Sequence, residues 1–494
     1  MSLASKASLV TLRVTYPYEG SSFQSGVGIV NSVKISLVVA IASTFLSPRA
    51  SRASLQKAAG QRVYVVAATF FTVQDSVSWA DVLARWFGAD DSGAELAMDR
   101  TTYDFLRLKL GPMNAIQIIA ADQIVQWAWD HPDSWVIVPF DALSPRLKVL
   151  QLSGWDVFKG VDGYPLAFSD GDPDYAPSDL TIVAMTGTTA MTRHTAEAID
   201  AHGPAWAAQE IGPVLQDFDY VHVSNEVSFF ADCPHSNSVR LLGDFCAKDS
   251  YLDVLKDSHV NLVELTGNHN NDYGYDADLR TLKMYHDNNM ATFGGGADQS
   301  SAQQPLILGN KGNNLLFVGC NSAGPLYAWA TDTTPGAARC NPTWFDPILS
   351  AQDGNIKFMD VQYDEYDQAW PLPQHRDDFL RLAAAGADVV IGTQAHQPMT
   401  FSFLGDRFIH YGLGNFYFDQ LPIVQRQFFI DEFIIYRGKL LSIQLLTGEI
   451  ADRAQPHLMD AAGRRRLLEK MFYLSQQITV PSQSPATTTP FATP

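Results

Sequence analysis

The 494-residue sequence lacks several features that would place it in a familiar class of protein. It has no run of about 20 apolar residues, so we expect no ordinary transmembrane helix. Basic residues are scarce, with 34 Lys and Arg against 53 Asp and Glu, which gives a net charge of −19. Because nucleic-acid proteins grip phosphates with clustered Lys and Arg, we expect no nucleic-acid partner. The four cysteines are too few for a disulfide-dense scaffold and have no zinc-ribbon spacing.

The remaining composition is that of a folded globular protein. Apolar residues make up 46% of the chain and charged residues 18%, which argues against a mostly disordered chain. The length predicts two or three domains. A Gly-, Asp- and Pro-rich stretch at 169–178 is the best candidate for a linker between them. The segments expected are an N-terminal region 1–60, a small α/β domain 61–168, a larger α/β domain 178–455, a C-terminal helix 456–480 and a disordered Ser/Thr/Pro tail 481–494.

The small domain shows alternating strand and helix patterns. Residues 62–72 and 135–140 are rich in β-branched and aromatic residues, which is typical of strands. Residues 78–87 have apolar residues at helical spacing behind Ser78, a favourable N-cap, and a second helix is expected over 122–130. Alternating strands and helices predict a mainly parallel sheet.

The N-terminal region allows two interpretations. A short apolar core at 35–46 is followed by small residues at 47–53, which resembles a signal peptide. About 34 residues precede this core, however, and residues 9–16 alternate as a strand does. Residues 1–53 are therefore either a signal-like segment or part of the first domain.

Six short polar motifs follow predicted strands of the larger domain. Because the carboxyl ends of neighbouring strands meet at one edge of an open α/β sheet, we expect these motifs to converge. Asn and His suit divalent metals such as Mn, Fe or Zn, and a carboxylate beside a His can also perform acid–base chemistry without metal. Taken singly, each motif has a structural explanation, since strand-end Asn residues often shape turns. The motifs are residues 185–193, 221–227, 262–274, 358–366, 389–396 and 409–420.

Together these motifs resemble the CapA, or poly-γ-glutamate biosynthesis, family of capsule-synthesis proteins. The segments that carry the resemblance are Gly267-Asn-His-Asn-Asn-Asp-Tyr-Gly274, Asn225-Glu226, Ala385-Gly-Ala-Asp-Val-Val-Ile-Gly392 followed by His396, and His410-Tyr-Gly-Leu-Gly-Asn-Phe416. The resemblance implies an α/β fold, a metallophosphatase-like four-layer sandwich preceded by a smaller α/β domain. Residues 61–168 resemble part of a substrate-binding protein that precedes this domain in some members.

The sequence departs from the family pattern at three positions that the resemblance marks as metal ligands. An expected Asp is Thr188, and two expected His are Gln362 and Gln394. Thr and Gln are weaker, neutral ligands, so a conventional dinuclear centre is not expected. The remaining ligands leave room for one divalent metal, Mn, Fe or Zn.

The resemblance assigns roles to a set of positions that a metal or an acid–base mechanism would use. Catalytic roles fall to Glu226, His269 and His396. Substrate-binding roles fall to Asn225, Gln362, Glu365, Gln394 and Asn415. Metal-binding roles fall to Asn268, His269 and His396.

The cysteines bear on the compartment in which the protein works. Two pairs in loop-like sequence fit disulfides, most simply Cys233–Cys246 and Cys320–Cys340, although four cysteines allow three pairings. Loop disulfides imply an oxidising compartment, which favours the extracellular space or the cell envelope. The alternative is four buried thiols in a cytoplasmic protein.

Three functions remain open from the sequence. The first is a hydrolase-like protein of capsule or poly-γ-glutamate biosynthesis that acts on phosphoester or amide bonds. The second is a non-catalytic binding or assembly protein for polymer synthesis or export, with a degenerate metal site. The third and weakest is a solute-binding protein. The partners expected for the first two are an anionic cell-surface polymer or its precursors and membrane-associated synthesis machinery; the sequence leaves the oligomeric state open.

Overall fold

The computed structural model describes residues 61–480 apart from four short gaps, and the structural statements below concern these residues. The predictions for 1–60, a signal-like or strand-forming segment, and for 481–494, a Ser/Thr/Pro tail, lie outside the described residues. The gaps are 91–92, 114–115, 171 and 235–244.

The first part of the described chain is a small mixed sheet flanked by helices. Its strands follow the order β4-β3-β5-β1-β6, and β8 also pairs with β1. The strands are β1 (Arg62–Thr69), β3 (Leu96–Met98), β4 (Gln117–Ile118), β5 (Trp135–Pro139), β6 (Leu147–Val149) and β8 (Ala167–Phe168), with a separate pair β2 (Ser76–Val77) and β7 (Gln151–Leu152). The helices are α1 (Trp79–Phe87), α2 (Arg100–Leu110) and α3 (Ile124–Asp130).

The prediction of a mainly parallel sheet in this part is wrong. The pairs β3–β4 and β3–β5 are parallel, but β1 runs antiparallel to β5, β6 and β8. The alternation of strands and helices describes the connections between β3, β4 and β5, where α2 and α3 intervene. It does not specify which distant strands flank β1, and those pairings decide whether the sheet is parallel or mixed.

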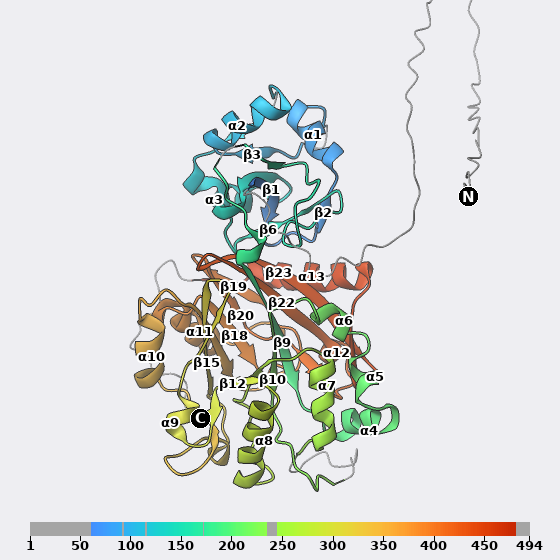
Figure 1. Ribbon diagram of the computed structural model, residues 1–494, viewed down its shortest axis with the longest axis vertical. Coiled ribbons are helices and arrows are strands. Elements are labelled where there is room, and N and C mark those ends of the chain that lie inside the picture. The colour runs from blue at the N-terminus through green and yellow to red at the C-terminus, as the bar shows by residue number, and fades with distance from the viewer. Residues whose placement is uncertain (1–60, 91–92, 114–115, 171, 235–244, 481–494) are drawn as a thin grey trace, which may run out of the picture. The chain divides into compact units, whose positions relative to one another are not determined.

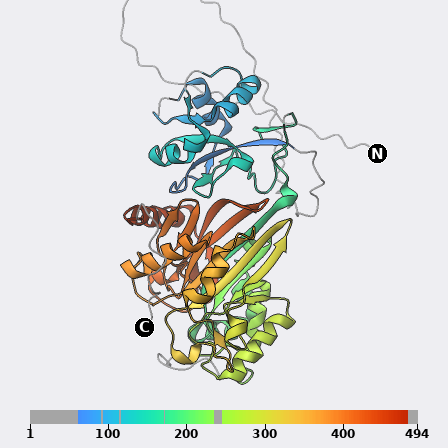
Figure 2. The same ribbon diagram turned by 90° about the vertical axis from the view of Figure 1, so that its left-hand side faces the viewer.

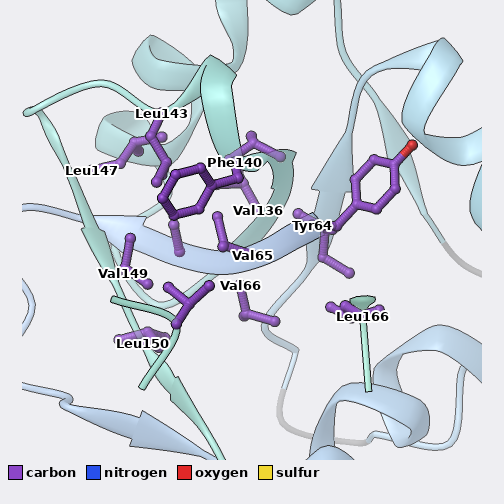
Figure 3. Packing of buried hydrophobic residues seen from close by; sticks show 14 of the residues in the cluster. Tyr64, Val65, Val66, Val136, Phe140, Leu143, Leu147, Val149, Leu150 and Leu166 are labelled. Atoms are coloured by element: carbon purple, nitrogen blue, oxygen red, sulfur yellow. The ribbon is translucent and has the colours of Figure 1, made fainter. Parts of the chain in front are cut away.

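The strand β1 forms the centre of this small core. Its residues 63–67 are fully buried because apolar side chains occupy both faces of the strand. Figure 3 shows Phe140 lying close to Val65, in the same buried cluster as Val136 and Leu166. Ser78 caps α1 as the sequence predicts, since its side chain accepts a hydrogen bond from the backbone N–H of Asp81.

The larger part of the chain is built on two sheets. The first has the order β12-β11-β10-β9-β22-β23-β24, with β21 beside β9, and the second has the order β14-β15-β17-β18-β20-β19. The first sheet contains β9 (Leu180–Thr189), β10 (Tyr220–Asn225), β11 (Leu262–Glu264), β12 (Ala291–Phe293), β21 (Asn415–Tyr417), β22 (Gln427–Tyr436), β23 (Lys439–Ala451) and β24 (Gln455–Leu458). The second contains β14 (Leu306–Asn310), β15 (Asn313–Asn321), β17 (Ile356–Gln362), β18 (Val389–Thr393), β19 (Phe401–Leu404) and β20 (Arg407–His410).

The two sheets pack face to face between layers of helices. Along β10, Val221 and Val223 belong to the core between the first sheet and its helices, because alternate residues of a strand face opposite sides. Along β17, Phe358 belongs to the core between the sheets, whereas Met359 belongs to the core under the second layer of helices. The predicted four-layer α/β sandwich is therefore confirmed.

In Figure 1, helices α4 to α8 lie on the side of β9 and β10, and helices α10 and α11 lie beside the second sheet. Figure 2 shows the same sheets after a turn of the view. The helices are α4 (Arg193–His202), α5 (Pro204–Ala208), α6 (Gly212–Leu215), α7 (Leu252–Asp257), α8 (Tyr275–Asp287), α9 (Gln299–Ala302), α10 (Pro342–Ser350), α11 (Pro373–Ala385), α12 (Ile423–Arg426) and α13 (Ala461–Gln476). A small strand pair, β13 (Gly295–Gly296) and β16 (Gly336–Ala337), completes the fold. Within the described ranges, no helix combines the length and apolar character needed to cross a bilayer.

Both disulfides form with the simplest of the pairings considered. Cys233 is bonded to Cys246, and Cys320 is bonded to Cys340. The second bond joins the end of β15 to the segment just before α10. The alternative of four buried thiols is therefore wrong for this structure.

Candidate functional site

Polar side chains from both sheets gather where several strands of the sandwich end. Glu226 directly follows β10, His269 lies beyond β11, and His396 follows β18. His396 lies 3.7 Å from Glu365, the backbone of Val227 next to Glu226 bridges to His269, and the charges of His396, Glu365 and His269 all act on the pKa of Glu226. Residues that are up to 170 positions apart by number, from Glu226 to His396, thus form one site.

Glu226 lies at the centre of this group. Its side chain is buried, with 2% exposure, and its Oε1 has no hydrogen-bond partner among the described residues. Burial raises the pKa of Glu226, although the nearby His396 and His269 oppose that effect. A buried carboxyl with a raised pKa holds its proton to higher pH, which suits a group that donates a proton during a reaction.

His269 is held in place by a carboxylate on its own loop. Its Nδ1 lies 2.6 Å from Oδ2 of Asp272, and the same oxygen accepts the backbone N–H of Phe245. Burial lowers the pKa of His269, but the hydrogen bond and charge of Asp272, together with Glu226, outweigh it and raise the pKa. The Asp272 contact leaves Nε2 as the basic nitrogen of the ring, so the pair resembles a base oriented by an acid.

His396 is oriented by an amide instead of a carboxylate. The Nδ2 of Asn415 faces three oxygen acceptors, from His396, Gln420 and Gln425. Its Oδ1 is therefore the atom that accepts from Nδ1–H of His396, at 2.7 Å. The other ring nitrogen, Nε2, lies 3.7 Å from the half-exposed carboxylate of Glu365.

The three positions that replace expected metal ligands do not fit a dinuclear metal centre. Gln362 donates a hydrogen bond from Nε2 to Oε1 of Gln394, so the two amides partly satisfy each other. Thr188 is buried and offers a neutral hydroxyl where a carboxylate would be needed. Over the described part of the chain, no three His, Cys, Asp or Glu side chains are grouped as in a metal site. The metallophosphatase-like fold is compatible with a metal, but this donor set is not that of a paired centre.

The two remaining predicted residues lie where β10 ends and in the turn that follows β11. The Nδ2 of Asn225 donates to the backbone oxygen of Val227 at 2.6 Å, and the side chain is fully buried. Asn268 lies next to His269 and is half-buried, and its Oδ1 has no partner in the described ranges.

A glycine brings these two turns together. A Cβ at Gly267 would lie 2.5 Å from Cα of Glu226, closer than real Cβ contacts allow. The backbone of Val227 also bridges to that of His269 as in a parallel strand pair. Glycine at 267 therefore lets Glu226 and His269 approach each other.

Sequence reasoning missed three residues that complete the site. Arg193 begins α4, and its charge acts on both Glu226 and His269. Asp419 binds Arg193, and Asp272 binds His269. All three lie inside the strand-end motifs 185–193, 262–274 and 409–420, so the charged residues within each motif are the signal that points to them.

Comparison with known proteins agrees with this architecture. Residues 182–420 match the family model of the bacterial capsule synthesis protein PGA_cap. The large domain of this chain is thus similar to the PGA_cap family.

Two curated relatives each match about half of this chain at low identity. The "Capsule biosynthesis protein CapA" of Bacillus anthracis is 26% identical over 48% of this chain and 60% of its own length. The "PGA biosynthesis protein CapA" of Bacillus subtilis (strain 168) is 25% identical over 49% of this chain and 64% of its own length. The matched region thus spans about three fifths of each relative.

Solved structures add little to the comparison. A hypothetical protein from Thermus thermophilus is 14% identical, aligned over 55% of this chain and 100% of its own, with a TM-score of 0.36. A score this low carries no argument about function.

Proposed function

We propose that this protein works in the biosynthesis of an anionic cell-surface polymer, of the capsule or poly-γ-glutamate type, and that its PGA_cap domain hydrolyses an amide or ester bond by acid–base chemistry. The observation that carries the proposal is Glu226, a buried carboxyl with a raised pKa beside His269. Its Oε1 is unpartnered among the described residues, so it is free to bond to a substrate. The names of the two relatives support the polymer class.

The residues divide the work of hydrolysis between them. His269 takes a proton from the attacking water at Nε2, while Asp272 accepts from Nδ1–H and stabilises the imidazolium that forms. Glu226 gives its proton to the leaving group, because burial raises its pKa and so favours the protonated form. His396, fixed by Asn415, and Glu365 lie beside them and bind the substrate. No step in this scheme needs a metal.

A single divalent metal is the variant of this proposal that the resemblance implies. Asn268, His269 and His396 would supply its ligands, and Mn, Fe or Zn would suit such nitrogen and oxygen donors. The same ring of His269 cannot both act as the free base and bind a metal through Nε2. Metal content therefore separates the two versions.

A non-catalytic binding or assembly role is the second candidate. The bonded pair Gln362 and Gln394 favours it, since amides at these positions provide contacts for a ligand but little catalytic power. In this role the site binds the polymer or its precursors, and membrane-associated synthesis machinery is the proposed partner.

The location proposed is the extracellular space or the cell envelope. The two disulfides carry this proposal, because such bonds persist in oxidising compartments. The test is thiol alkylation of the protein taken directly from its native host. If the proposal holds, all four cysteines are in disulfides and do not react with the reagent. If the protein resides in the cytoplasm, the free thiols are alkylated.

The test uses poly-γ-glutamate as the probe, with chain length followed by size-exclusion chromatography. Glu226→Gln and His269→Ala should each lower turnover by about 100-fold or more, since general acid–base groups contribute roughly 10²–10⁴-fold. His286→Ala is the matched control, because His286 is 89% exposed on α8.

Elemental analysis of protein purified without chelator accompanies the assay. The metal-free scheme predicts no stoichiometric metal in wild type. Near-stoichiometric Mn, Fe or Zn that disappears in His269→Ala would favour the single-metal version. Binding without turnover in wild type would favour the non-catalytic role.

A further inference from the structure

Arg193 adopts a backbone conformation that is unusual for its residue type. Its φ angle is +48°, in the left-handed region that residues with a Cβ rarely occupy. Such conformations persist where the surroundings hold them, and they gather at functional sites. The residue starts α4 directly after the segment that follows β9.

The surroundings of Arg193 fix both its backbone and its side chain. One oxygen of Asp419 accepts from Nη2 of Arg193 at 2.5 Å, and the other accepts the backbone N–H of His194 at 3.1 Å. The guanidinium also lies over the rings of Phe245 and Phe418, with 5.2 Å from its carbon to each ring centre. A long cation that usually moves freely is thus held in one position before any ligand arrives.

The held guanidinium keeps unused hydrogen-bonding capacity. Its Nε is buried and has no hydrogen-bond partner in the described ranges. Asp419 binds the group through a single oxygen, so the planar fork is not filled by a bidentate carboxylate. The side chain remains 19% exposed, which leaves part of it open to a ligand.

The position of Arg193 relates it to the proposed acid and base. Its charge acts on the pKa of Glu226 and of His269, so it lies near both. Phe418 packs against His396 and Phe245 packs against His269, at 4.6 and 4.7 Å between ring centres. The two rings that flank Arg193 therefore also border the imidazoles of the site.

We propose that Arg193 is the residue that recognises an oxyanion of the substrate, and so selects acidic polymers over neutral ones. The inference rests on the proposed function, since it concerns the same site. A planar fork with free N–H groups matches the geometry of a carboxylate or a phosphate. In a chain with a net charge of −19, a fixed cation at the site supplies the local attraction that an anionic ligand needs.

The experiment measures binding by calorimetry with poly-γ-glutamate, with its methyl-esterified form and with inorganic phosphate as competitor. Arg193→Gln should bind the acidic polymer about 10- to 100-fold more weakly than wild type, the range expected for a charge-assisted bond. Arg193→Lys keeps the charge but loses the fork, and should fall between the two. Arg465→Gln, at a 62% exposed position on α13, is the control and should bind as wild type does.

The outcomes separate this inference from the proposed function. Equal affinity of wild type for the acidic and esterified polymers, or unchanged affinity in both Arg193 variants, would overturn the role of Arg193. Wild type that binds neither the polymer nor phosphate would also overturn it. If Arg193→Gln does not fold, Arg193→Lys decides alone, and wild-type affinity in that variant counts against the proposal.

Turnover by Glu226→Gln tests the proposed function separately. A variant that binds the polymer normally but no longer cleaves it supports both statements. Undiminished cleavage would remove the acid–base scheme and leave the binding role of Arg193 standing. Competition by phosphate that is weaker in Arg193→Gln than in wild type would support recognition of an oxyanion by Arg193.

Discussion

His222 on β10 and Asp360 on β17 face each other across the space between the two sheets, with 3.1 Å from Nε2 to Oδ2. Both side chains are completely buried. A second pair, His410 on β20 and Asp431 on β22, bridges the same space at 2.6 Å, with the acid now on the first sheet. Two buried His–Asp pairs thus join the sheets, and the His is on the first sheet in one pair and on the second sheet in the other.

The register of the sheets places both pairs in one layer. In the first sheet, Met185 is paired with both His222 and Asp431, on either side of it. In the second sheet, Ile391 is paired with both Asp360 and His410. Each polar pair therefore flanks a central apolar position, which fixes how the two sheets align.

Removing one member of a buried pair should cost far more than removing a surface charge. We expect Asp360→Ala to lower the free energy of unfolding by about 3–5 kcal/mol, because His222 would stay buried without its acid. Asp287→Ala, which removes an exposed partner of Lys283, should change it by no more than about 0.5 kcal/mol. Urea unfolding of the three proteins checks this, and equal losses in the two variants would contradict it.

Asp278 on α8 should make stability fall as the pH rises. Burial raises the pKa of Asp278 to about 7, whereas an unfolded Asp loses its proton near 3.8. Between these values the folded state binds more protons, so the stabilising contribution is complete below pH 3.8 and is lost as the pH rises toward 7. The slope for one such group reaches about 1.4 kcal/mol per pH unit.

Asp278→Asn should remove this part of the pH dependence and raise stability at neutral pH. Denaturant unfolding at several pH values from about 4 to about 8 measures the slope. The exposed Asp276→Asn on the same helix is the control and should leave the slope unchanged. A variant Asp278→Asn that keeps the wild-type slope would mean that other groups set it.

Restoring the Asp and the two His that the family resemblance implies should create a metal site, provided that the replaced side chains alone prevent metal binding. The triple variant Thr188→Asp, Gln362→His and Gln394→His supplies the carboxylate and imidazoles that the family resemblance implies. We expect it to carry near-stoichiometric Mn, Fe or Zn by elemental analysis, in contrast to wild type. No metal in the triple variant would show that the backbone geometry also differs from a working centre.

The disulfide between Cys320 and Cys340 should contribute strongly to stability. It closes a loop with a sequence separation of 20, and in the loop-entropy model such a bond contributes about 3 kcal/mol. The double variant Cys320→Ala, Cys340→Ala should unfold at correspondingly lower denaturant concentration than oxidised wild type. Reduced wild type has lost both disulfides and should be no more stable than the double variant, whereas a double variant as stable as oxidised wild type would contradict the prediction.

Gly267→Ala should disturb the site because the new Cβ has no room. It would meet the backbone of Glu226 at 2.5 Å, and backbone cannot move aside as a flexible side chain can. We expect a loss of about 1–3 kcal/mol in stability, typical of overpacking, and lower turnover. Gly309→Ala on β14, where the nearest atom is 3.6 Å away, should be tolerated. Similar losses in both variants would argue against a steric cause.

Local pattern predicted much of this molecule. The alternation of Val221, His222 and Val223 indicates a strand with two different faces, and the structure places them on opposite sides. The strand-end motifs predicted where polar groups gather, because parallel strands finish at one edge whatever their exact order. The two cysteine pairs were also predictable, since each pair is close in sequence.

Sequence patterns did not predict the contacts between segments that are distant in the chain. The bond between Arg193 and Asp419 spans 226 positions. The family resemblance marked Gln362 and Gln394 as replaced ligands with substrate-binding roles, but it did not predict that they bond to each other. The antiparallel pairings of β1 in the small sheet belong to the same class.

The physical reason is the same in each case. The periodicity of a strand or helix is set by its own backbone geometry, so the sequence by itself determines which residues share a face. Which distant segment packs against that face depends on how the whole chain fills space, and only the tertiary structure decides it. The sequence therefore determined the sandwich and the place of the site, whereas the tertiary structure determined which side chains bond there, Arg193 to Asp419 and Gln362 to Gln394.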